Sequence, residues 1–418
     1  MKMQPDYGTF RSYLFFLSGQ LVSLLGSSIA QFVIIWWITL ETGSALFLSL
    51  ASLLGLAPMI LLSPFAGVFV DRWSRRGLVG VVDFLQALAT VMLIFLFVFG
   101  LVSVWHVLAL LTVRGVLQAF HRPAVSAITP SMVPKERLSR MNGLNYLFNG
   151  AVTLIGPVVA ALLLGFLEIF QILWIDVVTF LAALVPLLVI QIPSVRKGEE
   201  KASFREDFAE GFGFIKNTRG LLPFLVLATA LNFLIVPVPT LGAYYVKFDH
   251  LGGASELALL MASFQGGMLA GGLLMSVIKG FKKKMVVILS FSYILFLGYA
   301  IVALTPTGLF WFMALGALVM AFGIPIINVS YLTIVQTVVP LEMQGRVNSV
   351  DMALSSAAQP FGMILSGAVV GLTGTADLFL ACSISGILIL TLSWFATDIK
   401  YVEKMEEKST EKLTKIPA

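Results

Sequence analysis

The chain has 418 residues, of which 58% are hydrophobic and only 12% are charged, with a net charge of +5 and a mean hydropathy of +0.96. A water-soluble domain carries roughly 25% charged residues, so this composition excludes a disordered chain, a nucleic-acid-binding module and an ordinary soluble enzyme. The single cysteine, Cys382, excludes an internal disulfide. The three histidines, His106, His121 and His250, match no metal-ligand spacing, so no metal site is expected. The class that remains is a polytopic membrane protein.

Apolar runs without a charged residue recur along the whole chain, for example Ser12–Leu40 and Met352–Ala376. Each is long enough for the roughly 20 residues that cross a bilayer. The runs lack the two-residue alternation of a membrane barrel, and the first run is too long for a secretory signal, so we read it as an uncleaved span. The sequence therefore predicts an all-α membrane protein with twelve transmembrane helices, at 12–40, 46–70, 78–99, 104–125, 141–165, 169–192, 221–246, 255–278, 285–305, 308–330, 345–371 and 375–397.

Lysine and arginine are concentrated in the loops that twelve spans place on the same side as both termini. Only Lys247 falls on the opposite side, and only Arg114 falls inside a span. Because cytoplasmic loops carry an excess of Lys and Arg, both termini are expected in the cytoplasm.

The order of the spans predicts two six-helix bundles joined by a hydrophilic connection. The expected domains are an N-terminal bundle, a cytoplasmic linker loop, a C-terminal bundle and a charged cytoplasmic tail, at 1–192, 193–219, 220–399 and 400–418. The halves also repeat: Val133–Asn142 falls on Val339–Asn348 with Val, Pro, Glu, Arg and Asn at matching positions. Parallel halves of this kind place a substrate cavity between them near the bilayer midplane.

The second span ends in a run of mixed charge that contains Gly67, Asp71, Arg72 and Arg76. An anchor of positive charge would explain the arginines, but not the carboxylate among them or the glycine four residues earlier. The run resembles the first-loop signature of the major facilitator superfamily, Gly-x-x-x-Asp-Arg-x-x-Arg-Arg. The resemblance implies two pseudo-symmetric bundles and a conformational latch between them. To this latch we assign Gly67, Asp71, Arg72 and Arg76 together with the repeated-loop residues Glu136, Arg140, Glu342 and Arg346.

Arg114 lies near the middle of the fourth span, where a charge costs at least about 2.5–3.5 kcal/mol, so it must face protein or water. Arg114-x-x-x-Gln118-Ala119 resembles the superfamily's fourth-span motif, with Ala119 in place of a glycine. The resemblance implies that Arg114 takes part in proton coupling. The alternative is a structural ion pair, for example with Asp83 of the third span, and both interpretations stay open.

Asp176 is a carboxylate inside the sixth span. Burial disfavours the charged form of a carboxylate, so Asp176 is expected to bind and release the coupled proton. We group it with Arg114 and with Glu41, at the outer end of the first span, as the proton-coupling residues. Capping or ion pairing is the alternative for each carboxylate, and is the interpretation we favour for Asp83 and Asp351.

The fifth span contains Gly150, Gly156 and Pro157. Small residues allow close helix packing, and a proline permits bending. The resemblance to the superfamily implies that a Gly-Pro pair at this position is typical of antiporters, whereas an ordinary packing face is the alternative.

The substrate cavity is expected to be lined from spans one, four, seven, ten and their neighbours. Each polar or aromatic candidate could instead make a helix-packing hydrogen bond. A mostly apolar lining suits an amphiphilic or weakly basic compound. The candidates are Gln20, Gln31, Trp36, Asn145, Asn149, Asn232, Gln265 and Asn328.

Three short segments, Arg72–Arg76, Thr42–Ala45 and Phe120–Ala124, resemble the bacterial macrolide-efflux and drug:proton antiporter branch of the superfamily. The resemblance implies a proton-coupled exporter of amphiphilic drugs, such as macrolides, that works by alternating access in a bacterial inner membrane. The alternatives are export of an endogenous metabolite such as a siderophore, or a non-transporting scaffold or sensor.

The expected partners are the lipid bilayer, a small amphiphilic substrate and protons. No nucleic acid and no cofactor are expected, and we expect a monomer. The sequence lacks a Walker loop, so ATP is not expected to act through this chain itself. A separate ATP-binding partner protein is an alternative that nothing in the sequence indicates.

Overall fold

The computed structural model describes residues 7–192, 204–278 and 280–402, apart from the side chains of residues 7, 8, 64, 67–72 and 204–207. Within these ranges the regular structure is helical and contains no strand. Twelve helical segments among the described residues are long and apolar enough to cross a membrane. The predicted all-α class and number of spans are therefore confirmed, and the chain is a multi-pass membrane protein.

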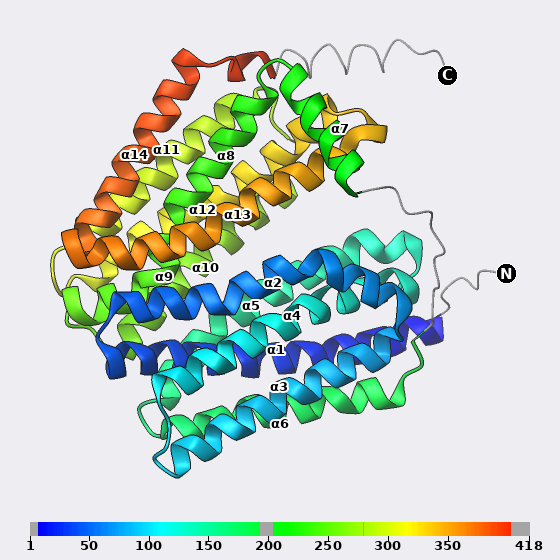
Figure 1. Ribbon diagram of the computed structural model, residues 1–418, viewed down its shortest axis with the longest axis vertical. Helices are drawn as coiled ribbons and strands as arrows, with labels where there is room; N and C mark the ends of the chain where they lie inside the picture. Colours follow the sequence, from blue (N-terminus) through cyan, green and yellow to red (C-terminus); the bar gives the residue numbers. More distant parts are fainter. Residues whose placement is uncertain (1–6, 193–203, 279, 403–418) are drawn as a thin grey trace. The chain divides into compact units, whose positions relative to one another are not determined.

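The chain forms two compact units (Figure 1). The first comprises Met1–Glu199 with the short pieces Val246–Phe248 and Gly252–Ala262, and the second comprises the remainder. The helices before residue 193 are α1 (Tyr7–Thr42), α2 (Ala45–Arg72), α3 (Arg75–Val98), α4 (Val104–Met132), α5 (Lys135–Leu163) and α6 (Ile169–Val189). Those that follow are α7 (Phe204–Asn217), α8 (Leu221–Ile235), α9 (Pro237–Tyr244), the π-helix η1 (Tyr245–Asp249), α10 (Ala254–Val277), α11 (Lys284–Ala303), α12 (Phe310–Val338), α13 (Leu341–Thr373) and α14 (Thr375–Ala396).

Several helices extend beyond the predicted spans. The predicted fifth and eleventh spans begin at residues 141 and 345, whereas α5 begins at Lys135 and α13 at Leu341. Each helix has a proline as its N-cap residue and a glutamate in its first turn. The negative charge stabilises the positive end of the helix dipole, so the helix continues through residues too polar for hydrocarbon. Counting uncharged residues measures the apolar stretch and misses these polar ends.

The predicted seventh span, 221–246, is not one continuous helix. Helix α8 ends at Ile235, and Pro237 is the first residue of α9. A proline is favourable at a first helical position because it has no N–H to donate and its φ angle is preset. By contrast, Pro325 lies inside α12 without ending it.

The segment predicted as a linker loop, 193–219, contains the helix α7. The carboxylate of Glu210 on α7 forms an ion pair with Arg346 on α13, with 2.5 Å between Oε2 and Nη1. The backbone at Gly211 also lies against the backbone of Arg346. These contacts attach α7 to the second unit. Residues 193–203 of the predicted linker and 403–418 of the predicted tail lie outside the described residues.

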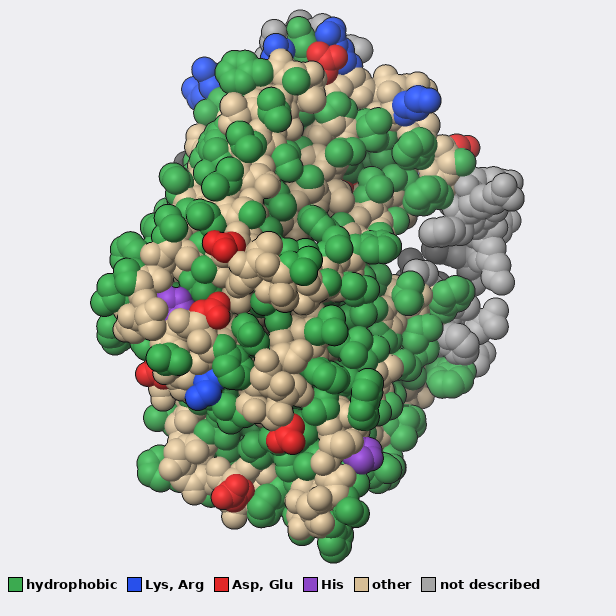
Figure 2. All heavy atoms as spheres, turned by 60° about the vertical axis from the view of Figure 1, so that its left-hand side comes forward, with side chains coloured by type: hydrophobic (Ala, Val, Ile, Leu, Met, Phe, Trp, Pro, Cys, Tyr) green, Lys and Arg blue, Asp and Glu red, His purple; other side chains and the backbone are tan. Residues whose placement is uncertain are grey.

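Helix α1 is the centre of the first unit, where it packs against α4, α5 and α6. Its buried Tyr13 and Phe16 belong to an apolar cluster with Ile128 and Met132 of α4. Figure 2 shows a face on which hydrophobic side chains predominate and charged side chains are few. Such a surface is expected where lipid replaces water around a protein.

A glycine allows helices α2 and α4 to pack closely against each other. A Cβ atom at Gly115 would lie 2.7 Å from the carbonyl oxygen of Gly55 and 3.1 Å from that of Leu54. Backbone carbonyls cannot rotate away as a side chain can, so only a residue without a side chain fits at this contact.

Gly115→Ala is therefore predicted to separate α2 from α4 and to destabilise the first unit by about 1–3 kcal/mol, the usual cost of overpacking. The apparent melting temperature of the purified protein in detergent should fall. Gly143→Ala on α5 is the matched control, because a Cβ atom there has nothing within 4 Å. Equal melting temperatures for the two variants would contradict the contact.

Candidate functional site

A buried ion pair joins α4 to α6 inside the first unit. The guanidinium of Arg114, with 9% of the residue exposed, lies with Nη1 3.2 Å from Oδ2 of Asp176, which is 3% exposed. Ser27 on α1 donates to Asp176 Oδ1 at 2.8 Å, and Thr90 on α3 donates to Oδ2 at 3.0 Å. Arg114 Nη2 in turn donates to Ser27 Oγ at 3.2 Å. Four helices thus supply one charge-compensated polar cluster in an apolar interior.

The alternative pairing of Arg114 with Asp83 is wrong. Asp83 instead lies beside His121 of α4, with 2.8 Å between Oδ1 and Nε2. His121 is seven residues after Arg114, which is two helical turns, so both side chains lie on the same face of α4 at different depths. The two basic side chains on this face each lie beside a different carboxylate.

The cluster and the Asp83–His121 pair are two levels of a polar ladder between α3 and α4. Between them, Gln118 Nε2 donates to Gln86 Oε1 at 3.2 Å. The spacing on each helix is that of one helical face. The residues are Asp83, Gln86 and Thr90 on α3, and Arg114, Gln118 and His121 on α4.

The second unit has no such cluster at the matching positions. Helices α4, α5 and α6 begin at residues 104, 135 and 169, and α12, α13 and α14 begin at 310, 341 and 375, which is the same shift of 206 positions each time. The shift places an apolar or weakly polar side chain opposite each charged one: Met320 for Arg114 and Cys382 for Asp176. The helix arrangement therefore does not require the charges.

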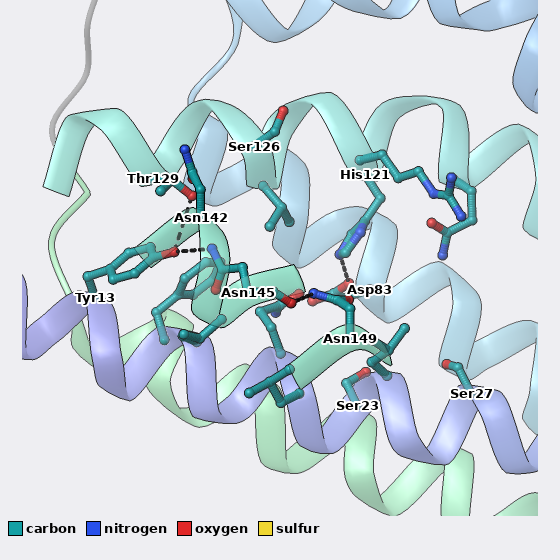
Figure 3. A pocket seen from close by; sticks show the side chains of 18 of the residues that line it. Tyr13, Ser23, Ser27, Asp83, His121, Ser126, Thr129, Asn142, Asn145 and Asn149 are labelled. Carbon is teal, nitrogen blue, oxygen red and sulfur yellow. Dashed lines mark hydrogen bonds and ion pairs between the residues drawn. The ribbon is translucent and has the colours of Figure 1, made fainter. Parts of the chain in front are cut away.

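A cavity of about 720 Å³ lies within the first unit. Gln20, Asn145 and Asn149 of the predicted candidates line it, together with Asp83 and His121. Figure 3 shows Asp83 of α3, His121 of α4, and Asn145 and Asn149 of α5 around this cavity. Arg114 and Asp176 are not among its lining residues, but Ser27, which hydrogen-bonds to both, is, so the ion pair lies directly behind the cavity wall.

A second cavity, of about 220 Å³, lies within the second unit. It is lined by the predicted candidates Asn232 and Asn328, and by Asp351, which accepts a hydrogen bond of 2.7 Å from Tyr331. The three other candidates line neither cavity: Gln31 is exposed, Trp36 is buried and Gln265 is partly buried.

Glu41, the third predicted proton-coupling residue, is exposed near the end of α1 and is not part of the charged cluster. Of the predicted antiporter residues, Gly156 and Pro157 are buried in α5 and Gly150 is partly buried. A Cβ atom at Gly156 would collide with Ser28, so this glycine allows the close approach of α1 and α5.

The side chains of the predicted latch residues Asp71 and Arg72, and the surroundings of Gly67, lie outside what the structure describes. Arg76 donates from Nη2 to the carbonyl of Leu188, near the end of α6, at 2.5 Å. Glu136 and Arg140 are exposed in the first turns of α5.

No role was predicted for Ser27, Thr90, Gln86 or His121. Their hydroxyl, amide and imidazole groups are common in helices, so each residue alone carries little information. The combined three- and four-residue spacing on two neighbouring spans was a usable signal, since it puts polar groups on one face of each helix.

Comparisons with known proteins agree with this architecture. The sequence pattern described as Major Facilitator Superfamily matches residues 16–359. Macrolide efflux protein A of Streptococcus pyogenes is 30% identical over 394 residues, which cover 94% of this chain and 96% of that protein. The multidrug efflux pump Tap of Mycolicibacterium fortuitum is 24% identical over 400 residues, covering 93% and 97%. A solved bacterial homologue of the iron transporter ferroportin, in an inward-facing state, has a TM-score of 0.70 at 18% identity, covering 92% of this chain and 98% of that one. This last likeness shows a shared fold.

Arg114→Met is predicted to destabilise the first unit by about 3–5 kcal/mol, because it leaves the buried carboxylate of Asp176 without its cation. The apparent melting temperature should fall strongly. In the double variant Arg114→Met/Asp176→Asn no unpaired charge is buried, so most of the loss should be recovered.

The control is Arg122→Met, an exposed position on the same helix that should change stability by no more than about 0.5 kcal/mol. If the double variant is as unstable as the sum of its parts, the two side chains are not coupled.

Proposed function

This chain belongs to the Major Facilitator Superfamily, and we propose that it exports small amphiphilic compounds, drug-like or macrolide-like, in exchange for protons. It is a transporter and not an enzyme, as its family and its efflux relatives show. The observation that carries the proton-exchange proposal is the buried cluster of Arg114 and Asp176.

The direction of transport and the class of cargo are supported by the relatives. Macrolide efflux protein A and the multidrug efflux pump Tap each match nearly the whole chain. The buried Gly156-Pro157 pair of α5 supports the same direction, because the family associates it with antiport. The basic loops support a bacterial inner-membrane location with both termini in the cytoplasm.

The proposed proton step takes place at Asp176. Protonation removes the charge that attracts Arg114 and turns one carboxylate oxygen from an acceptor into a donor. Ser27 and Thr90 both donate to this carboxylate, so their hydrogen bonds must rearrange at the same time. Because the four residues come from α1, α3, α4 and α6, loading a proton changes the forces between these helices.

In the proposed cycle, cargo leaves to the outside, a proton binds Asp176, and its release to the cytoplasm restores the ion pair. Rocking of the two halves exposes the cavity to each side in turn. We propose that the protein acts as a monomer in the lipid bilayer, driven by the proton gradient without a cofactor or an ATP-binding partner.

Asp176→Asn tests the proton step. In inverted membrane vesicles with an acidic interior, accumulation of labelled erythromycin should fall to background, because an amide cannot take up and release the coupled proton. Binding of erythromycin to the purified variant should persist. Asp377→Asn, an exposed carboxylate in the first turn of α14, is the matched control and should accumulate normally.

Unchanged pH-driven accumulation in Asp176→Asn would show that another group carries the proton. The same vesicles distinguish the cargo alternatives. Accumulation of an iron-chelating siderophore but not of erythromycin would favour metabolite export, and accumulation of neither would favour a sensor or scaffold.

The proposed latch is tested by Asp71→Asn. Removing this carboxylate should lower the maximal rate of erythromycin accumulation without changing the concentration that gives half the maximal rate, since the change affects conformational exchange and not binding. A normal maximal rate would contradict the latch assignment of Asp71.

A further inference from the structure

Asp83 and His121 form a second ionisable pair that the proton step does not use. Asp83 is 2% exposed, and one of its two oxygens, Oδ1, contacts His121 Nε2. Both residues line the 720 Å³ cavity, whereas Arg114 and Asp176 do not. The carboxylates of Asp176 and Asp83 therefore have different surroundings: the first lies between packed helices and the second lies at a cavity.

Apart from His121 Nε2, which lies 2.8 Å from Asp83 Oδ1 in the ion pair, three residues of this cavity each have a buried polar atom without a hydrogen-bond partner. These atoms are Asp83 Oδ2, Gln20 Nε2 and Asn145 Oδ1. Folded proteins seldom bury such atoms unsatisfied, because the desolvation cost is then not offset. The three residues come from α3, α1 and α5, so an open donor and two open acceptors surround one space.

In two of these side chains, the other polar atom already has a partner. Asn145 donates from its amide nitrogen to the Tyr13 hydroxyl at 3.0 Å, whereas its side-chain oxygen has no partner. His121 occupies only one oxygen of Asp83. Figure 3 shows both contacts at the cavity.

The chemistry of the open atoms defines a ligand. Asp83 is the one carboxylate among the described residues that line the cavity, and the basic side chains in that lining are His121 and Arg122. A carboxylate oxygen without a partner matches a protonated amine, which makes a charge-assisted hydrogen bond. One amide donor and one amide acceptor match a hydroxyl group. The cavity volume is within the range of small-molecule sites, about 300–1,000 Å³.

We propose that this cavity binds the protonated amine of the exported compound at Asp83, and a neighbouring hydroxyl at Gln20 and Asn145. This inference rests on the proposed function and specifies its substrate class as amphiphiles that carry a basic nitrogen. Asp83 is the cargo carboxylate and Asp176 the proton carboxylate. His121 is a positioning residue that holds the Asp83 carboxylate.

The test compares two probes on purified protein in lipid nanodiscs. Labelled erythromycin carries a basic dimethylamino group, and its N-demethylated, N-acetylated derivative carries no basic nitrogen. The unaltered protein should bind erythromycin more tightly than the derivative. In Asp83→Asn, erythromycin should bind about tenfold or more weaker, the loss expected for a hydrogen bond between charged groups, while the derivative binds as before. Asp83→Glu should keep the preference for the amine.

Gln20→Leu is the second variant, and it keeps the proposal testable if Asp83→Asn does not fold. It removes a donor that both probes use, so both should bind more weakly by a similar factor and the preference for the amine should remain. Asp377→Asn should bind both probes like the unaltered protein.

The site would be refuted if the preference for the amine survived Asp83→Asn, or if both probes bound equally more weakly to that variant. It would also be refuted if the unaltered protein bound neither probe, because the cavity would then hold only water. These results are separate from the vesicle assay. Asp83-dependent binding without pH-driven accumulation would refute the transport proposal and leave the site intact. pH-driven accumulation together with an unchanged preference for the amine in Asp83→Asn would refute the site and leave the transport proposal intact.

Discussion

The buried contact between Arg114 and Asp176 is the interaction that constrains how α1, α3, α4 and α6 meet in the first unit. A single buried charge in an apolar interior would be costly, so Asp176 needs both its cation and hydrogen-bond donors for its oxygens. The close packing of α1 supplies one of these donors, Ser27. A Cβ atom at Gly26 would lie 3.2 Å from the Cα atom of Asp176, so only a glycine lets α1 come near enough for Ser27 to reach the carboxylate. The absence of a side chain at Gly26 thereby makes possible the hydrogen bond that stabilises the buried carboxylate of Asp176.

The second unit shows what the fold is without this cluster. Met320 and Cys382 occupy the positions that correspond to Arg114 and Asp176, and the helices around them begin at matching places. An apolar packing is therefore compatible with the same helix order, so the charges of the first unit are maintained at an energetic cost that stability alone does not justify. This contrast between equivalent helices supports the proposal that the cluster takes part in transport.

The number of spans and the repeat could be predicted from the sequence because both depend on local composition: a charge-free run of sufficient length has few alternatives in a bilayer. The partner of Arg114 could not be predicted in this way. Whether it meets Asp83 or Asp176 depends on how α4 is rotated against α3 and α6, and span positions do not contain that rotation. Likewise, the polar first turns of α5 and α13 are helical because of their caps and dipoles, which a hydropathy profile does not measure. His121 was overlooked for a similar reason, since its importance comes from the carboxylate it faces and not from its neighbours in the chain.

Helix α5 is longer than a bilayer requires. Its 29 residues extend about 44 Å, well beyond the roughly 30 Å of a hydrocarbon core. Asn149 is its middle residue, whereas Glu136 lies almost at its start. A tilt of about 10° about the middle of such a rod would carry its ends through roughly 4 Å and leave the fulcrum nearly still. In the proposed cycle, a tilt of α5 would therefore leave Asn149 beside the bound compound while Glu136 moves, so a single helix would serve both binding and conformational change.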